Sequence, residues 1–256
     1  MSDTVPSSEA ADTPGKEKAI VELYRQLNTK CGEILENSLA NGRERSLAAA
    51  HLCVHEFEMW HASLEPRLES YLVGSAGREL QYALLSVVQG HYGHAFKSLR
   101  LVLELGLQAV YLSSNAVAVR EWLASKKDTN WNEIVNDENG VFSARFVGAF
   151  CADLLSHRKT YSSLATTLYR ECSECVHGNV QKHIDLPKQL SFNEATLELW
   201  HRKLQNVVLV VQFVYYLRYF DELTEVQQTA LEPILADRLG HVPEIRLRFG
   251  LVGGEK

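Results

Sequence analysis

Residues 161–179 read YSSLATTLYRECSECVHGN, and their apolar positions recur every three or four residues, the period of an α-helix. On a helical wheel at about 100° per residue, one broad arc holds Tyr161, Leu164, Ala165, Leu168, Tyr169, Cys172, Cys175 and Val176. The opposite face holds Ser163, Thr166, Thr167, Arg170, Glu174 and His177. The stretch therefore predicts a helix that packs through one side, presents polar groups on the other and ends at Gly178.

The same helical period extends over most of the chain. Helices are predicted over residues 16–39, 45–64, 77–112, 142–155, 160–176 and 191–220, the third with a bend at Gly90 and Gly93. Ser191 and Glu194 form a capping-box pattern, and Asn115 is a cap for a short helix. No stretch alternates as a strand does. We predict an all-α fold, with a single helical domain over residues 16–256.

Residues 1–15 contain Ser, Pro, Asp and Ala with almost no large apolar side chain, a composition that predicts a disordered tail. In the whole chain of 256 residues, 46% are hydrophobic and 23% charged, which is enough apolar material for a sizeable core. The very apolar stretch 207–217 is too short to cross a bilayer. It is interpreted as a buried helix core or, alternatively, as a dimer face. Trp60, Trp122, Trp131 and Trp200 are scattered and are interpreted as packing residues.

Charge and cysteine content limit the classes of function. The formal net charge is −6, so no overall basic field attracts nucleic acid. The five cysteines are an odd number, and no apolar segment follows the first Met. Reduced thiols, a cytoplasmic location and no membrane span are expected.

The polar face of the helix around residue 170 contains two groups that carry chemistry. Arg170 and His177 are seven residues apart, so they point in nearly the same direction about 10.5 Å apart along the axis. Glu174 lies between them. The simplest interpretation is a solvated Glu174–Arg170 pair and a histidine near a helix C-terminus, each of which stabilises any helix.

These residues also resemble a known family. Arg170-x6-His177 resembles the Arg-x4–6-His signature of the HEPN superfamily, and LYRECSECVHGN resembles the motif helix of HEPN-like proteins from prokaryotic toxin and defence loci. Upstream, HAFKSLRLVLELGLQAVYL, with Arg100 and Glu104 one turn apart, is similar to a helix of an uncharacterised HEPN-related group. The resemblance covers residues 81–179 and implies a HEPN-like core over about 77–220.

The resemblance implies a metal-independent endoribonuclease of a toxin or antiviral-defence type, acting as a homodimer without a cofactor. Arg170 would stabilise charge on the scissile phosphate of an RNA substrate, and His177 would transfer a proton. The expected supporting residues are Arg100, Glu104, Glu174 and Asn179. The chain departs from the family pattern at Glu171, where active members often carry Asn, Asp or His. This glutamate adds negative charge where a polyanion must approach.

Arg100 and Glu104 lie in a helix that is apolar on most sides, and a buried charged pair is tolerated only when it is well paired. Two interpretations remain open. The two side chains form a structural pair, or they orient Arg170 or His177 from behind.

A zinc site at Cys172, Cys175 and His177 is disfavoured, because on a continuous helix the two cysteines point to the packed face and the histidine points away. The cysteines are interpreted as small packing groups. Further histidines occur at positions 51, 55, 61, 91 and 94, without the paired Glu-x-x-His pattern of a di-iron bundle. No metal is expected.

A second hypothesis comes from a different class of protein. The chain would be a non-catalytic helical interaction or sensor protein that docks a partner protein of a defence or toxin–antitoxin system. The polar face of residues 161–177 would then be a binding surface or only a solvated face.

Overall fold

The computed structural model describes residues 13–128, 130–177 and 184–251. The described part is helical throughout, without a β-strand, which confirms the predicted all-α class. The α-helices are α1 Thr13–Leu39, α2 Glu44–Ser63, α3 Ser70–Val88, α4 Tyr92–Ser113, α5 Ala116–Leu123, α6 Trp131–Ile134, α7 Ala144–Phe150, α8 Arg158–His177, α9 Glu194–Tyr219, α10 Glu225–Leu239 and α11 Pro243–Arg248.

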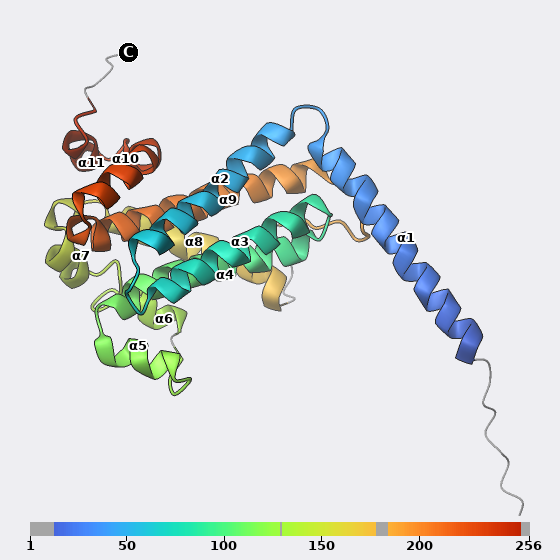
Figure 1. Cartoon of the computed structure of the whole chain (residues 1–256), viewed down its shortest axis with the longest axis horizontal. Coiled ribbons are helices and arrows are strands. Elements are labelled where there is room, and N and C mark those ends of the chain that lie inside the picture. Colours follow the sequence, from blue (N-terminus) through green and yellow to red (C-terminus); the bar gives the residue numbers. More distant parts are fainter. Residues whose placement is uncertain (1–12, 129, 178–183, 252–256) are drawn as a thin grey trace, which may run out of the picture.

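Four long helices, α2, α3, α4 and α9, form the centre of the molecule (Figure 1). They contact one another in a ring: α2 packs on α3, α3 on α4, α4 on α9 and α9 on α2. Helix α8 packs across α4 and α9, while α10 and α11 cover one end of the bundle (Figure 1). The helix that carries Arg170 and His177 therefore lies on the outside of a rigid core.

Aromatic side chains fill the bundle. Trp60 and Trp200 are fully buried, and their indole N–H groups donate to Gln212 Oε1 at 2.6 Å and to the carbonyl oxygen of Ala95 at 3.1 Å. The ring of Tyr215 meets Trp60 edge to face at 5.3 Å. In the stretch 207–217 most side chains are buried, which confirms the core interpretation over the dimer face.

The predicted continuous helix over residues 77–112 is wrong at both its start and its middle. Helix α3 begins at Ser70, and the chain reverses completely between α3 and α4 rather than bending. Gly90 has φ +82°, and a Cβ atom there would lie 3.0 Å from Ile34 Cδ1. Glycine at this position therefore serves the turn, and α3 and α4 pack side by side.

One of the two predicted helix N-caps is confirmed and the other is wrong. Asn115 Oδ1 accepts from the backbone N–H groups of Val117 and Ala118 at 3.1 and 2.9 Å, as predicted. The cap of α9 is Asn193, which accepts from the N–H of Thr196 at 2.9 Å, so the predicted Ser191 capping box is wrong. Both a serine hydroxyl and an asparagine amide oxygen can cap a helix. The N-cap position depends on where the preceding chain turns into the helix.

Helix α1 confirms the predicted N-terminal helix and starts at Thr13, so the expected tail over residues 1–15 overlaps it by three positions. The remaining part of that tail lies outside the described residues. The C-terminal end of α1 touches the bundle, and the rest projects away from it (Figure 1). Every residue from 17 to 30 is exposed, including the apolar ones.

A buried polar network joins α2, α9 and α10. Arg238 Nη2 donates to Glu56 Oε1 at 2.6 Å, and Gln212 Nε2 donates to Glu56 Oε2 at 2.8 Å. Gln212 in turn accepts from Trp60. The Glu56 side chain is 8% exposed and that of Arg238 15%, so both charges depend on each other inside the protein.

We expect Gly106→Ala to destabilise the protein by about 1–3 kcal/mol, the usual cost of overpacking a core. A Cβ atom at Gly106 would lie 2.8 Å from Val211 Cγ2, where α4 meets α9. Combining it with Val211→Ala should give a favourable coupling energy in a double-mutant cycle measured by urea unfolding. Gly32→Ala is the control, because nothing lies within 4 Å of a Cβ there, and it should stabilise α1 slightly. Equal effects at the two glycines would contradict the close approach.

Among the described helices, none combines the length and the apolarity that crossing a bilayer requires.

Candidate functional site on the outer face of helix α8

Helix α8 runs without interruption from Arg158 to His177. Its polar face is solvent-exposed at Ser163, Thr166 and Arg170, as the sequence pattern predicts. No hydrogen bond or ion pair holds Arg170 among the described residues, so its guanidinium is available to a ligand. The backbone of His177 closes the helix, while its side chain and the whole of Asn179 lie outside the described residues.

The opposite face of α8 packs on the bundle. Tyr161, Ala165, Leu168 and Cys172 are buried, which confirms the predicted packed arc. Val176 is the exception, because it is 41% exposed although the pattern placed it on that arc. Val176 therefore lies at the edge of the packed face, next to the buried Cys175.

Arg100 and Glu104 of α4 form an ion pair, the first of the two predicted arrangements. Arg100 Nη2 lies 3.1 Å from Glu104 Oε1 and donates to the hydroxyl oxygen of Tyr169 at 2.5 Å. The Arg100 guanidinium also stacks over the Tyr169 ring at 4.4 Å. Arg100 therefore holds the residue directly before Arg170, while no direct contact with Arg170 is formed.

Tyr169 is held from its other side by Trp131 of α6. The two rings stack 3.9 Å apart at an angle of 8°. Burial, followed by the nearby Glu104 carboxylate, raises the pKa of the Tyr169 phenol. The hydroxyl therefore remains a neutral hydrogen-bonding group near neutral pH. The Tyr169 ring lies between the Arg100 guanidinium of α4 and the Trp131 indole of α6. These contacts fix the rotation of the turn of α8 that carries Arg170.

Glu171, which departs from the family pattern, is neutralised in the structure. Its carboxylate forms a short ion pair with Lys203 Nζ of α9, and both side chains are largely buried. Glu171 thus points toward the neighbouring helix rather than along the exposed face. Its charge is compensated, so it does not add a negative field beside Arg170. Glu174 lies half-buried one turn further on.

The two cysteines of α8 are packing groups, as predicted. Cys172 is 1% exposed and Cys175 is 9% exposed. Burial raises the pKa of the Cys172 thiol to about 12 and that of Cys175 to about 11. Among the described residues, no group of three His, Cys, Asp or Glu side chains is placed to hold a metal ion.

We expect thiol labelling at pH 8 to modify Cys31 first. Cys172 and Cys53 are buried, and burial raises the pKa of the Cys53 thiol to about 11, so almost no thiolate exists at pH 8. Labelling of these two should require unfolding in guanidinium, as read by mass spectrometry. Modification of Cys172 in the native protein as fast as Cys31 would contradict the packed face of α8.

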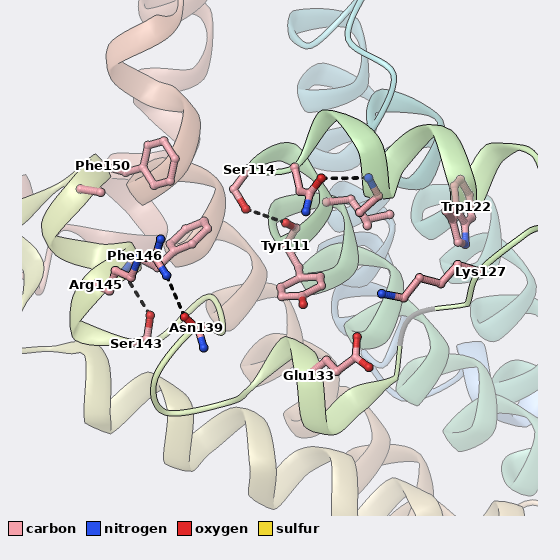
Figure 2. Close-up of a pocket in the computed structure, with 14 residues that line it drawn as sticks. Tyr111, Ser114, Trp122, Lys127, Glu133, Asn139, Ser143, Arg145, Phe146 and Phe150 are labelled. Atoms are coloured by element: carbon pink, nitrogen blue, oxygen red, sulfur yellow. Dashed lines mark hydrogen bonds between the residues drawn. The ribbon is translucent and has the colours of Figure 1, made fainter.

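A separate pocket of about 380 Å³ lies between the ends of α4, α5, α6 and α7. Figure 2 shows Tyr111 with Lys127 and Glu133 on one side and Arg145 on the other. Arg145 Nη1 donates to Asn139 Oδ1 at 2.9 Å. None of the residues predicted for the site lines this pocket. Helices α4 and α6 each supply residues both to this pocket and to the packing around Tyr169.

Sequence reasoning missed the residues that position the site. Tyr169 and Trp131 were interpreted as independent packing residues, and Lys203 was not singled out at all. Their roles depend on which helices become neighbours and in what register. The only available signal was the aromatic character of the first two.

Comparisons of the chain with protein-family models, with curated proteins and with solved structures give no match. The site is therefore defined by its geometry alone. The site consists of the exposed Arg170 on α8, with His177 two turns further along the same helix. On its packed side the helix is held by contacts of Tyr169 with Arg100 and Trp131.

Proposed function

We propose that the chain is a HEPN-like, metal-independent endoribonuclease of a toxin or antiviral-defence type, using Arg170 and His177. The observation that carries the proposal is the unbroken course of α8 from Arg158 to His177. It keeps these two positions on one side of the molecule, about two turns apart. Arg170 is exposed there and engaged by no other described side chain.

The electrostatics around Arg170 support the proposal locally, although the whole chain is acidic. Lys203 compensates Glu171, and the Arg100–Glu104 pair lies against Tyr169 on the packed side of α8. A scissile phosphate can therefore approach Arg170 without meeting an uncompensated Glu171.

The chemistry assigned to the site is transesterification within RNA. The ribose 2′-oxygen forms a bond to the adjacent phosphorus, and the bond from phosphorus to the 5′-oxygen breaks. The 2′-hydroxyl loses a proton and the 5′-oxygen gains one, so atoms and charge balance without another reactant. Imidazole suits this proton transfer because its unperturbed pKa lies near neutrality, and the guanidinium stabilises the charge that develops on the phosphate.

A homodimer cleft belongs to the proposal, because one exposed face of α8 offers little enclosure for a substrate. Two copies that bring their α8 faces together would supply two arginines and two histidines around one RNA strand. The fixed rotation of α8 by Tyr169 and Trp131 suits this use, since catalytic groups require rigid support.

A second candidate function is favoured by a specific observation. The arm of α1, residues 17–30, carries large apolar side chains that are 40–68% exposed. Such a surface is typical of proteins that dock a partner. In this alternative the chain is a non-catalytic interaction or sensor component of a defence assembly, and α8 is only a solvated face.

The two functions are separated by incubating purified wild-type protein with tRNA, rRNA and synthetic RNAs of varied sequence in EDTA. The nuclease proposal expects cleavage of at least one RNA, with Arg170→Ala/His177→Ala as the inactive control. It also expects slower growth when the wild-type chain, but not this variant, is expressed. Intact RNA together with harmless expression would contradict the nuclease and leave the interaction function.

A further inference from the structure

The pocket between the ends of α4, α5, α6 and α7 has the dimensions of a small-molecule site. Its volume of about 380 Å³ falls within the roughly 300–1,000 Å³ of pockets that enclose small ligands. Aromatic side chains from three helices line it: Tyr111 of α4, Trp122 of α5, and Phe146 and Phe150 of α7. All except Phe146 are half-buried, so part of each ring surface is left for a ligand. Flat apolar rings pack well against such walls.

Arg145 is presented to this pocket by a tightly folded loop between α6 and α7. The backbone N–H of Val141 donates to the carbonyl oxygen of Ile134 at 2.9 Å and closes the loop. A Cβ atom at Gly140 would lie 2.4 Å from that same carbonyl oxygen, so the loop requires glycine there. Within the loop, Asn139 Oδ1 accepts from Arg145 Nη1 at 2.9 Å. The guanidinium is therefore held in place by the protein before any ligand binds.

Arg145 and Lys127 line the pocket with positive charge that no described carboxylate pairs with. Asn139 occupies one of the five N–H donors of Arg145, and Lys127 forms no hydrogen bond or ion pair within the described part of the chain. The Tyr111 hydroxyl, which Figure 2 shows between the two cations, likewise has no hydrogen-bond partner there. Three groups with free donors therefore surround the pocket, an arrangement that suits a ligand rich in acceptors.

Glu133 determines how such a ligand is oriented. Of the described residues that line the pocket it is the one acid, and it lies on the same side of Tyr111 as Lys127, opposite Arg145 (Figure 2). The acidic residues 137 and 138 belong to the loop, but they are exposed and do not line the pocket. An anionic group is therefore attracted to the Arg145 side, whereas a hydrogen-bond donor suits the Glu133 side.

We infer that this pocket binds a planar aromatic anion, in which a flat ring carries a carboxylate or phosphate at one end and a hydrogen-bond donor at the other. The anionic group pairs with Arg145, whose planar guanidinium matches two oxygens of either group. The ring packs along the aromatic walls beside Tyr111, and its donor reaches Glu133. The site is distinct from the α8 face, because neither Arg170 nor any neighbour of it on α8 lines the pocket.

The inference is tested by isothermal titration calorimetry on the full chain, with 4-aminobenzoate and adenosine 5′-monophosphate as probes. At least one should bind saturably with a Kd below about 1 mM. Its neutral counterpart, 4-aminobenzamide or adenosine, should bind at least 10-fold more weakly, because it lacks the group that pairs with Arg145. Binding of 4-aminobenzoate alone identifies a carboxylate as the natural anion, and binding of the nucleotide alone identifies a phosphate.

Arg145→Gln should weaken binding of the same probe about 10- to 100-fold, because hydrogen bonds to charged groups are the strong ones. The matched control is Arg120→Gln, since Arg120 is an exposed arginine of α5 that does not line the pocket. It should bind like wild type. Arg170→Ala should also bind like wild type, which separates the pocket from a phosphate site on α8. All three side chains are exposed, so circular dichroism should show each variant folded.

Three results would overturn the inference. The first is the absence of saturable binding of either probe at 10 mM. The second is binding by Arg145→Gln that equals wild type or falls no further than that of Arg120→Gln. The third is binding that Arg170→Ala abolishes. Heat of binding is measured without RNA, so a failed nuclease assay leaves this test unaffected.

Discussion

Replacing Arg170 with alanine is expected to lower the rate of RNA cleavage at least 100-fold while leaving the melting temperature within about 2 °C of wild type. Loss of one group that stabilises developing charge costs about 10²–10³ in rate. The folded protein should not respond, because Arg170 is exposed and makes no contact with another described side chain. His177→Ala should give a loss of similar size, since proton transfer contributes about 10²–10⁴. Rates are measured with one end-labelled RNA under single-turnover conditions.

Arg202→Ala is the matched control for this result. Arg202 lies on the adjacent helix α9, is exposed like Arg170, and forms only a long, exposed contact of 3.9 Å with Glu198. It should cleave RNA like wild type. The role of Arg170 would be contradicted if both arginine variants retained activity, or if both lost it equally.

The largest expected effect on stability comes from Arg238→Ala. Removal of this side chain leaves the Glu56 carboxylate buried without its ion pair, which typically costs about 3–5 kcal/mol. For a chain of this size the melting temperature should fall by roughly 10 °C. Gln212 continues to donate to Glu56 at 2.8 Å, so the carboxylate keeps one partner and the fold survives at low temperature. Urea unfolding at 25 °C measures the change in free energy.

Arg248→Ala is the corresponding control. Arg248 also forms an ion pair, with Asp221, but the two side chains are 40% and 55% exposed. Exposed pairs contribute about 0–1 kcal/mol, so the variant should unfold close to wild type. A loss from Arg238→Ala no larger than that from Arg248→Ala would show that the Glu56 network does not hold α2, α9 and α10 together.

The helical class and most helix positions could be predicted because burial imposes a period of 3.6 residues on the sequence. Helix α8 is the clearest case, since the arc from Tyr161 to Cys172 is buried as its spacing requires. The break between α3 and α4 was not predicted. A long apolar stretch with two glycines is compatible with either a bend or a reversal. The chain reverses because Gly90 adopts a positive φ and α3 packs along α4, which periodicity alone does not reveal.

The candidate site could be predicted only to the level of single helices. The spacing of Arg170 and His177, and of Arg100 and Glu104, follows from residues on one helix. The stack of Tyr169 on Trp131 and the pairing of Glu171 with Lys203 join residues far apart in sequence. Such contacts depend on how helices pack, and periodicity carries no information on that register.

Helix α1 illustrates the same limit in a different way. Its apolar spacing correctly predicted a helix. The spacing does not specify whether the apolar side is covered, because that depends on how the helix is placed against the rest of the chain. In this chain the bundle covers only the end of that face near Ile34.

The central claim, that this chain cleaves RNA by transesterification without a metal, is tested most directly by the ends of its products. RNA cut by the wild-type protein in EDTA should yield fragments with a 2′,3′-cyclic phosphate on one side and a 5′-hydroxyl on the other, as read by enzymatic end-labelling and mass spectrometry. Cleavage that requires Mg²⁺ and leaves 5′-phosphates, or RNA that stays intact at every protein concentration, would contradict it.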